Sequence, residues 1–229
     1  MIVASMAGRY GFSQTDPDEL KQRFQIGENL AHVVMLPSYN VQSGQIMPVV
    51  TRRKVNRLEM MQWGLQPAWL KSGRPLINAS AETLMEKKTY RELLPSQRCL
   101  IPASWFYAWQ AMAEGKKPYY IGLTETKLFS FAGLYDVEYD TKGHAVRRFL
   151  IITCAPNALV APITDRMPVI LTRKAEDDWL DPDRTRPDQL LPLLRPYPAG
   201  KMHAYRIGKL INLPNVDTED IIKPEAGGR

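Results

Sequence analysis

Two polar side chains lie within apolar, proline-bounded stretches of the chain. Asn78 follows the apolar run PLI, and Arg166 directly precedes the segment MPVIL. A buried or half-buried amide or guanidinium must find hydrogen-bond partners, because its unpaired burial is costly. Asn78 and Arg166 are therefore either internal braces that hold loops or members of a binding site, and their residue types leave both interpretations open.

General catalytic motifs are absent from the sequence, which contains no GxSxG, no P-loop, no HExxH and no GxGxxG before a helix. His32 lies in an apolar segment and is expected to be packed, His144 lies in a turn and is expected to be solvated, and His203 precedes a basic stretch. Cys99 and Cys154 lie in apolar stretches without metal-ligand spacing, which predicts reduced core thiols. We expect no metal ion and no cofactor.

Strand-like segments dominate the middle of the chain, because they are rich in β-branched and aromatic residues and bounded by Gly, Pro or charge. They span residues 44–50, 57–63, 104–110, 117–123, 128–139, 146–154 and 167–171. Helices are expected at 17–26, 81–94, 174–180 and 189–194, the first capped by Asp16 with Pro17 at its first position. Strands outnumber helices without regular alternation, which predicts an α+β fold with a mostly antiparallel, curved sheet.

Composition is that of a folded protein, with 229 residues, 45% hydrophobic and 24% charged. We expect one domain over 1–229, no membrane span, no signal peptide, a cytoplasmic location and a monomer. The net charge of +6 permits binding to nucleic acid without proving it. The polar, acidic tail from Asp217, and residues 225–229 above all, are expected to be frayed.

Five longer segments occur in a distinctive order. They read WGLxPxW at 63–69, PLINAxxET at 75–83, RCLxPAxxFYxW at 98–109, FAGL at 131–134 and DRMPVIL at 165–171. Together they resemble the SOS-response-associated peptidase (SRAP) family of abasic-site processing proteins, from about Met6 to about Pro224. The resemblance implies an SRAP-like α+β fold with a barrel-like core and short flanking helices, and it makes residues 1–5 an N-terminal extension.

The resemblance also implies a chemistry. Family members typically start Met-Cys-Gly-Arg, and removal of the Met exposes a Cys whose amine and thiol attack the ring-opened aldehyde of an abasic site in single-stranded DNA. An amine alone gives a reversible imine, whereas the thiolate closes a stable thiazolidine. An Asn in PLINAR, a Glu in FYEW and a His in HDRMP support the reaction. The same N-terminal group is thought to explain the peptidase label.

Four of these family residues are replaced in this sequence. Ala7 stands for the Cys, Ala108 for the Glu, Thr164 for the His and Ser80 for the Arg of PLINAR, while Asn78 is kept. Alanine supplies no nucleophile, and loss of a positioned acid or base costs about 10²–10⁴-fold. We therefore expect a degenerate site at Ala7, Asn78, Ala108 and Thr164, with thiazolidine formation abolished.

Residues that line the DNA cleft in the family are retained. Their matches are Arg9, Asn40, Trp69, Asn78 and Arg166, with a basic rim at Lys71, Arg74, Lys87 and Lys88, whose alternative role is a solvated surface charge. Stacking on Trp69 and phosphate contact by the arginines would bind single-stranded DNA, while Trp63 is expected in the core.

Three functions remain open from the sequence. The chain could be an SRAP-like protein that binds single-stranded or abasic DNA non-covalently in a DNA-damage response. It could be an enzyme with altered chemistry, in which an Ala7 amine forms an imine if translation starts at Met6. It could also be an interaction protein that keeps the fold without binding DNA.

Overall fold

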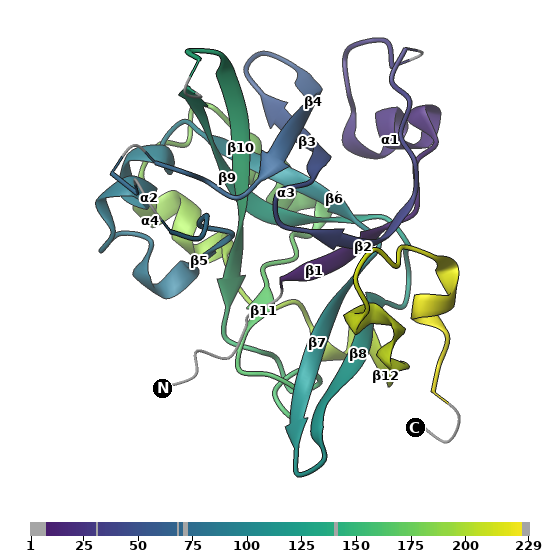
Figure 1. Ribbon diagram of the computed structural model, residues 1–229. Helices are drawn as coiled ribbons and strands as arrows, with labels where there is room; N and C mark the ends of the chain where they lie inside the picture. The colour runs from purple at the N-terminus through teal and green to yellow at the C-terminus, as the bar shows by residue number, and fades with distance from the viewer. Residues whose placement is uncertain (1–7, 31, 68, 71–72, 140–141, 226–229) are drawn as a thin grey trace.

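A computed structural model describes residues 8–30, 32–67, 69–70, 73–139 and 142–225. Two β-sheets form its framework (Figure 1). The five-stranded sheet runs in the order β12 (Met202–Arg206), β8 (Gly115–Leu123), β7 (Trp105–Met112), β1 (Arg9–Phe12) and β2 (Ser38–Gln42). All of its pairings are antiparallel.

The second sheet closes into a barrel. Its order is β11 (Met167–Pro168), β10 (Ala145–Cys154), β4 (Asn56–Trp63), β3 (Ile46–Arg52), β6 (Arg98–Ala103) and β9 (Phe129–Tyr139), with β5 (Asn78–Ser80) beside β10. Because β9 also pairs with β10, the strands β10, β4, β3, β6 and β9 form a closed ring. Among the strand pairings of the described residues, those of β10 with β4 and β5 are parallel and the others are antiparallel. The predicted α+β fold with a mostly antiparallel, barrel-like core is confirmed.

Short helices flank the sheets. They are α1 (Pro17–Phe24), α2 (Lys88–Leu93), α3 (Arg173–Leu180) and α4 (Pro187–Leu190), with 3-10 turns η1 (Ala81–Thr83), η2 (Leu191–Leu193), η3 (Ala199–Lys201), η4 (Lys209–Asn212) and η5 (Glu219–Ile222). The side chain of Asp16 caps α1 by accepting the backbone N–H of Asp18 at 2.9 Å, as predicted. None of the helices in these described residues is long and apolar enough to cross a membrane.

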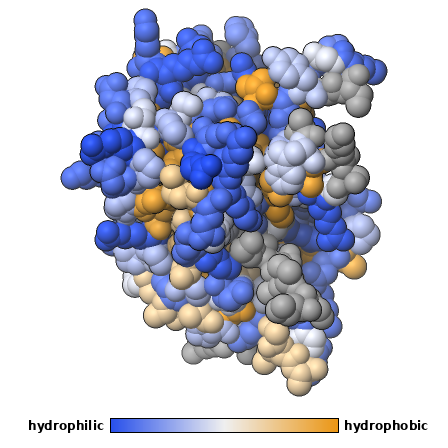
Figure 2. Space-filling view, turned by 90° about the vertical axis from the view of Figure 1, so that its left-hand side faces the viewer, coloured by the Kyte–Doolittle hydropathy of each residue, from blue (hydrophilic) through white to orange (hydrophobic). Residues whose placement is uncertain are grey.

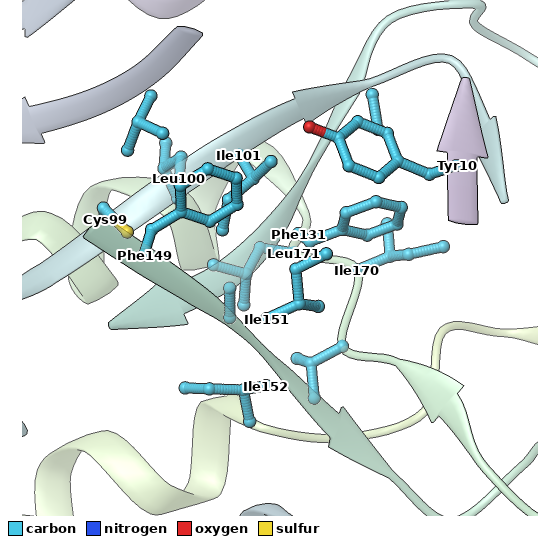
Figure 3. Close-up of a cluster of buried hydrophobic side chains, with 14 of the residues drawn as sticks. Tyr10, Cys99, Leu100, Ile101, Phe131, Phe149, Ile151, Ile152, Ile170 and Leu171 are labelled. Atoms are coloured by element: carbon cyan, nitrogen blue, oxygen red, sulfur yellow. The ribbon is translucent and has the colours of Figure 1, made fainter. Parts of the chain in front are cut away.

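The main core fills the barrel and the space between the sheets (Figure 3). Tyr10 of β1 meets Phe131 of β9 edge to face, with ring centroids 5.7 Å apart. Trp63 is buried and donates to the carbonyl of Ile77 at 2.9 Å, so its predicted core position is confirmed. Cys99 and Cys154 are buried free thiols, also as predicted.

A glycine lets the N-terminal strand β1 pair closely with β7 in the five-stranded sheet. A Cβ on Gly11 would lie 1.9 Å from Cε2 of Trp105, so only glycine lets β1 lie directly against this indole. The following Ser13 then bonds Ser104 through its backbone N–H at 3.1 Å. This close pairing fixes the position of β1 in the sheet, and with it the position of Arg9 at the start of the strand.

Four local predictions were wrong. The single helix at 81–94 is divided into η1 and α2, because Glu82 accepts bonds from Arg166 and from the backbone N–H of Ala155. The strand at 167–171 is limited to β11, and Ile170 forms only an isolated bridge. His32 is exposed rather than packed, because it lies on the surface loop that follows α1.

The predicted frayed tail is the fourth error. Residues 217–225 are ordered in the fold, because Ile221 is 1% exposed and packs against the five-stranded sheet. The carboxylate of Asp217 accepts bonds from Ser38 and from the backbone of Tyr39. Hydrophobic residues spaced within a polar segment therefore hold it in place. Residues 226–229 lie outside the described residues.

Candidate functional site

The loop 161–166 lies against one face of β7. Gln110 of β7 donates from Nε2 to the carbonyl of Pro162 at 2.9 Å and accepts the hydroxyl of Tyr119 at 3.1 Å. Because side chains alternate along a strand, Ala108 shares this face with Gln110. Thr164 is carried by the loop itself, so the structure brings Ala108 and Thr164 to the same side of the β7–β8 hairpin.

We call Gly8, Ala108 and Thr164 the degenerate face, because they lie at or beside the positions where family chemistry is expected. Ala108 is 5% exposed, and the hydroxyl of Thr164 donates only to its neighbour Asp165, at 3.4 Å. Ala7 lies outside the described residues, but Gly8 directly follows it. Neither Ala108 nor Thr164 offers a group that could accept or release a proton near neutral pH.

A pocket of about 420 Å³ opens beside the degenerate face. It is lined by Gly8, Arg9, Trp109, Ala111, Lys116, Thr164 and Asn212. In the described residues, no thiol, imidazole or carboxylate lines this pocket. Its lining instead offers two cations and an indole, which suits a phosphate and a stacked ring rather than acid–base chemistry.

Arg9 is held in place on three sides. Its guanidinium donates to the carbonyl of Ile211 and to Oδ1 of Asn40, the latter at 3.5 Å, and lies 5.8 Å from the ring centre of Trp109. Burial lowers the pKa of Arg9 from its usual value, yet a guanidinium keeps its charge in this range. A fixed positive charge therefore lies at the pocket wall.

Asn40 has a bracing position in this structure. Its side chain is 1% exposed, and its Nδ2 donates to the carbonyl of Val216 at 2.8 Å. Sequence reasoning placed Asn40 among the DNA-lining residues. Its direct contact with DNA stays a prediction. In the structure, Asn40 accepts a hydrogen bond from Arg9, and Arg9 lines the pocket.

Arg166 is also braced. It pairs with Glu82 at 2.6 Å, bonds Oγ of Ser80 at 2.8 Å and donates to the carbonyl of Thr153 at 2.8 Å. The hydrogen bond from Arg166 is the main cause that lowers the pKa of Glu82 to about 2. Ser80, at the position where the resemblance implies an Arg in the family, is therefore one of the partners that orient Arg166.

Asn78 lies on β5 next to this cluster. Its backbone is paired with Ile151 of β10, and its carbonyl accepts the hydroxyl of Tyr90 at 3.4 Å. Because residues two apart on a strand share a face, the side chains of Asn78 and Ser80 lie on the same side of β5. The structure thus brings Asn78 and Arg166 to one edge, as the shared motif order suggested.

Trp69 lies on the rim. Its indole is 63% exposed and is oriented by a bond from Nε1 to the hydroxyl of Thr89 at 3.1 Å. A second pocket, of about 530 Å³, is lined by Trp69, Leu76, Lys87, Lys88, Thr89, Tyr90 and Glu92. The side of the molecule that carries α2 is mostly hydrophilic, with apolar groups in smaller patches (Figure 2). Arg74 is exposed, and Lys71 lies outside the described residues.

Three functional candidates were missed from the sequence. Lys116 and Asn212 line the pocket, and Trp109 forms its aromatic wall. Trp109 belongs to the FYxW motif and could have been found there, whereas nothing in the sequence around Asn212 distinguishes it. Within the described residues, no group of His, Cys, Asp or Glu is arranged to hold a metal ion.

Comparison with known proteins identifies the family. A sequence model described as "SOS response associated peptidase (SRAP)" matches residues 6–214. This chain belongs to the SRAP family. The Abasic site processing protein YoqW of Bacillus subtilis (strain 168) is 42% identical over 224 residues, which cover 95% of this chain and 99% of the relative. The SRAP resemblance inferred from the ordered motifs is confirmed.

More distant SRAP relatives extend the match. The Abasic site processing protein HMCES of Gallus gallus is 29% identical over 82% of this chain and 66% of its own length. A crystal structure of a protein from Bacteroides thetaiotaomicron superposes with a TM-score of 0.84 at 28% identity, covering 95% of this chain and 99% of that one. The SRAP fold is thus supported by both sequence and structure.

Proposed function

We propose that this SRAP-family chain binds single-stranded DNA, including strands with an abasic site, without forming a covalent bond. The observation that carries the proposal is the lining of the pocket beside Gly8. The lining contains Arg9, Lys116 and Trp109, while Ala108 and Thr164 occupy the positions that the resemblance assigns to the family acid–base residues. The protein would be a pseudoenzyme of the DNA-damage response, with the cytoplasm as its expected location and a monomer as its expected state.

Charge supports binding to a polyanion. The chain carries a net charge of +6, and Lys116 and Lys87 are exposed at the two pockets. Lysine and arginine contacts to phosphates release counterions, so affinity falls as salt rises. The exposed indole of Trp69 offers a face on which any base can stack. Together these groups favour a single strand without sequence preference.

The braced arginines favour one alternative role. Arg9 and Arg166 already have protein partners, which reduces the positive charge open to a phosphate. An interaction protein that retains the SRAP fold without binding DNA would show this pattern. The distinguishing property is salt-dependent affinity, because only phosphate contacts produce it.

Fluorescence anisotropy tests the proposal. A labelled single-stranded oligonucleotide with one abasic site is titrated at low and high salt, and the matching duplex is the control. With three to four phosphate contacts, a rise from about 50 to about 200 mM salt should weaken binding roughly 20- to 50-fold. The duplex should bind more weakly than the single strand. No binding at low salt would overturn the proposal in favour of the interaction protein.

A further inference from the structure

The C-terminal part of the chain lies across the outer face of the five-stranded sheet, beside β8, β1 and β2 (Figure 1). We call residues 207–222 the strap. Ile211 and Ile221 are 0% and 1% exposed and pack with Trp105 and Tyr107 in a second hydrophobic cluster. The strap is thus docked by apolar burial, although most of its other residues are polar or exposed.

Two side chains that line the pocket, Arg9 and Trp109, are held by the strap. The carbonyl of Ile211 accepts a bond from Arg9, and Oδ1 of Asn212 accepts Nε1 of Trp109 at 3.0 Å. The carbonyl of Val216 accepts Asn40 at 2.8 Å. Three strap residues therefore orient the cation and the indole of the pocket and the amide that bonds the cation.

Three further hydrogen bonds fasten the strap at its far end. Asp217 accepts the hydroxyl of Ser38 at 2.9 Å and the backbone N–H of Tyr39, both on β2. The carbonyl of Ile222 accepts the hydroxyl of Tyr205 of β12 at 2.8 Å. The family match ends at residue 214, so this fastening lies beyond the matched region.

We propose that the strap positions the DNA-contacting side chains, that Asn212 is the positioning residue for Trp109, and that strap docking and DNA binding are coupled. The inference rests on the proposed DNA binding. A long side chain that is already oriented loses less conformational entropy when a ligand binds. Coupling between two equilibria is reciprocal, so bound DNA must also tighten the strap.

Two variants test the coupling. Asn212→Ala removes the acceptor of Trp109, and Asp217→Ala unfastens the strap from β2. Each should weaken single-strand binding about three- to tenfold, the equivalent of roughly one hydrogen bond. Leu213→Ala is the control, because Leu213 is a strap residue that is 49% exposed, and its affinity should stay within about twofold. If Asp217→Ala does not fold, Asn212→Ala decides, because Asn212 is exposed.

Amide hydrogen exchange distinguishes coupling from a purely structural role of the strap, because a purely structural role would leave the exchange rates of the strap unchanged when DNA is added. Adding the oligonucleotide to the wild-type chain should slow exchange in the strap, and Asn212→Ala should reduce that slowing. Wild-type binding with unchanged affinity in both variants and no slowing in the strap would overturn this inference and leave the proposed function standing. Absence of wild-type binding would overturn both.

Discussion

The degenerate face and the two braced arginines differ in how many contacts their side chains make with the rest of the protein. Ala108 and Thr164 make few polar contacts, whereas Arg9 and Arg166 each have three partners. A side chain used only for chemistry can be lost without loss of folding, since no buried partner is left unsatisfied. A guanidinium that satisfies buried carbonyls cannot be lost so easily, because each orphaned group costs about 1–3 kcal/mol.

The largest expected effect comes from restoring the degenerate face. A chain that starts at Met6 and carries Ala7→Cys, Ala108→Glu and Thr164→His should form a covalent adduct with an abasic oligonucleotide. Ala7→Cys alone should react about 10²–10⁴-fold more slowly, because the acid–base groups are still missing. The yield is read on denaturing gels. The matched control keeps Ala7 with the other two changes and should give no adduct.

Failure of the folded triple variant to react would contradict the view that the degenerate face has lost only its reactive side chains. It would mean that the degenerate face differs from a working site in more than its side chains, for example in the path of the loop 161–166. Circular dichroism on the same sample establishes that the variant is folded, so the two outcomes stay separate.

Trp69→Ala tests whether the exposed indole contributes to DNA binding and not to folding. A stacked base is worth about 1–3 kcal/mol, so single-strand affinity should fall roughly 5- to 150-fold. The free energy of unfolding should change by less than about 0.5 kcal/mol, because an exposed side chain supports little packing. Tyr139→Ala is the control, since Tyr139 is an aromatic residue that is 74% exposed on β9. Equal affinity losses in both variants would remove Trp69 from the site.

Arg166→Ala tests whether the hydrogen bonds of Arg166 stabilise the fold. It should lower the free energy of unfolding by about 1–3 kcal/mol, because the carbonyl of Thr153 and the carboxylate of Glu82 lose their partner. Urea denaturation measures it. Arg186→Ala is the control, because its ion pair with Asp188 is exposed and its loss should cost less than about 1 kcal/mol. Equal stability of the Arg166 variant and the wild type would contradict the bracing role.

The smallest expected effect is a pH dependence of the same brace. The pKa of Glu82 lies at about 2, below the value of 4.5 for an unperturbed carboxyl. A lowered carboxyl pKa contributes stability above the unfolded value, and that contribution is lost as pH falls from 4.5 towards 2. The urea midpoints of the wild type and Glu82→Gln should therefore converge over this range. Parallel midpoints throughout would show that Glu82 contributes nothing through its charge.

The family resemblance predicted the barrel-like core, and the residue pattern predicted most but not all of its strands. Long apolar segments such as β9 and β10 were found, because their β-branched and aromatic residues read as strands on their own. The short strands β1, β2, β5 and β12 were missed, since three to five residues carry little pattern. The barrel strand β6 was missed as well. The predicted helix at 81–94 failed because the tertiary bonds of Glu82 to Arg166 outweigh local helix propensity.

The candidate site was predicted in part. The family resemblance assigned Asn78, Ala108 and Arg166 to one site. The structure brings Asn78 and Arg166 together through β5, where Ser80 bonds Arg166, and the place of Ala108 in the same site stays a prediction. Asn212 could not be found, because its role depends on a strap that crosses the sheet over a hundred residues after Trp109. The order of residues 217–225 was missed for the same reason, since the apolar surface that Ile221 covers belongs to β7 and β8.

One measurement tests the central claim most directly. The wild-type chain is incubated with an abasic single-stranded oligonucleotide, and the same mixture is run on a native gel and on a denaturing gel. We predict a shifted band on the native gel and only free oligonucleotide on the denaturing gel, because the proposed binding mode uses no nucleophile. A shifted band that survives denaturation would contradict the account, and so would the absence of any shift on the native gel.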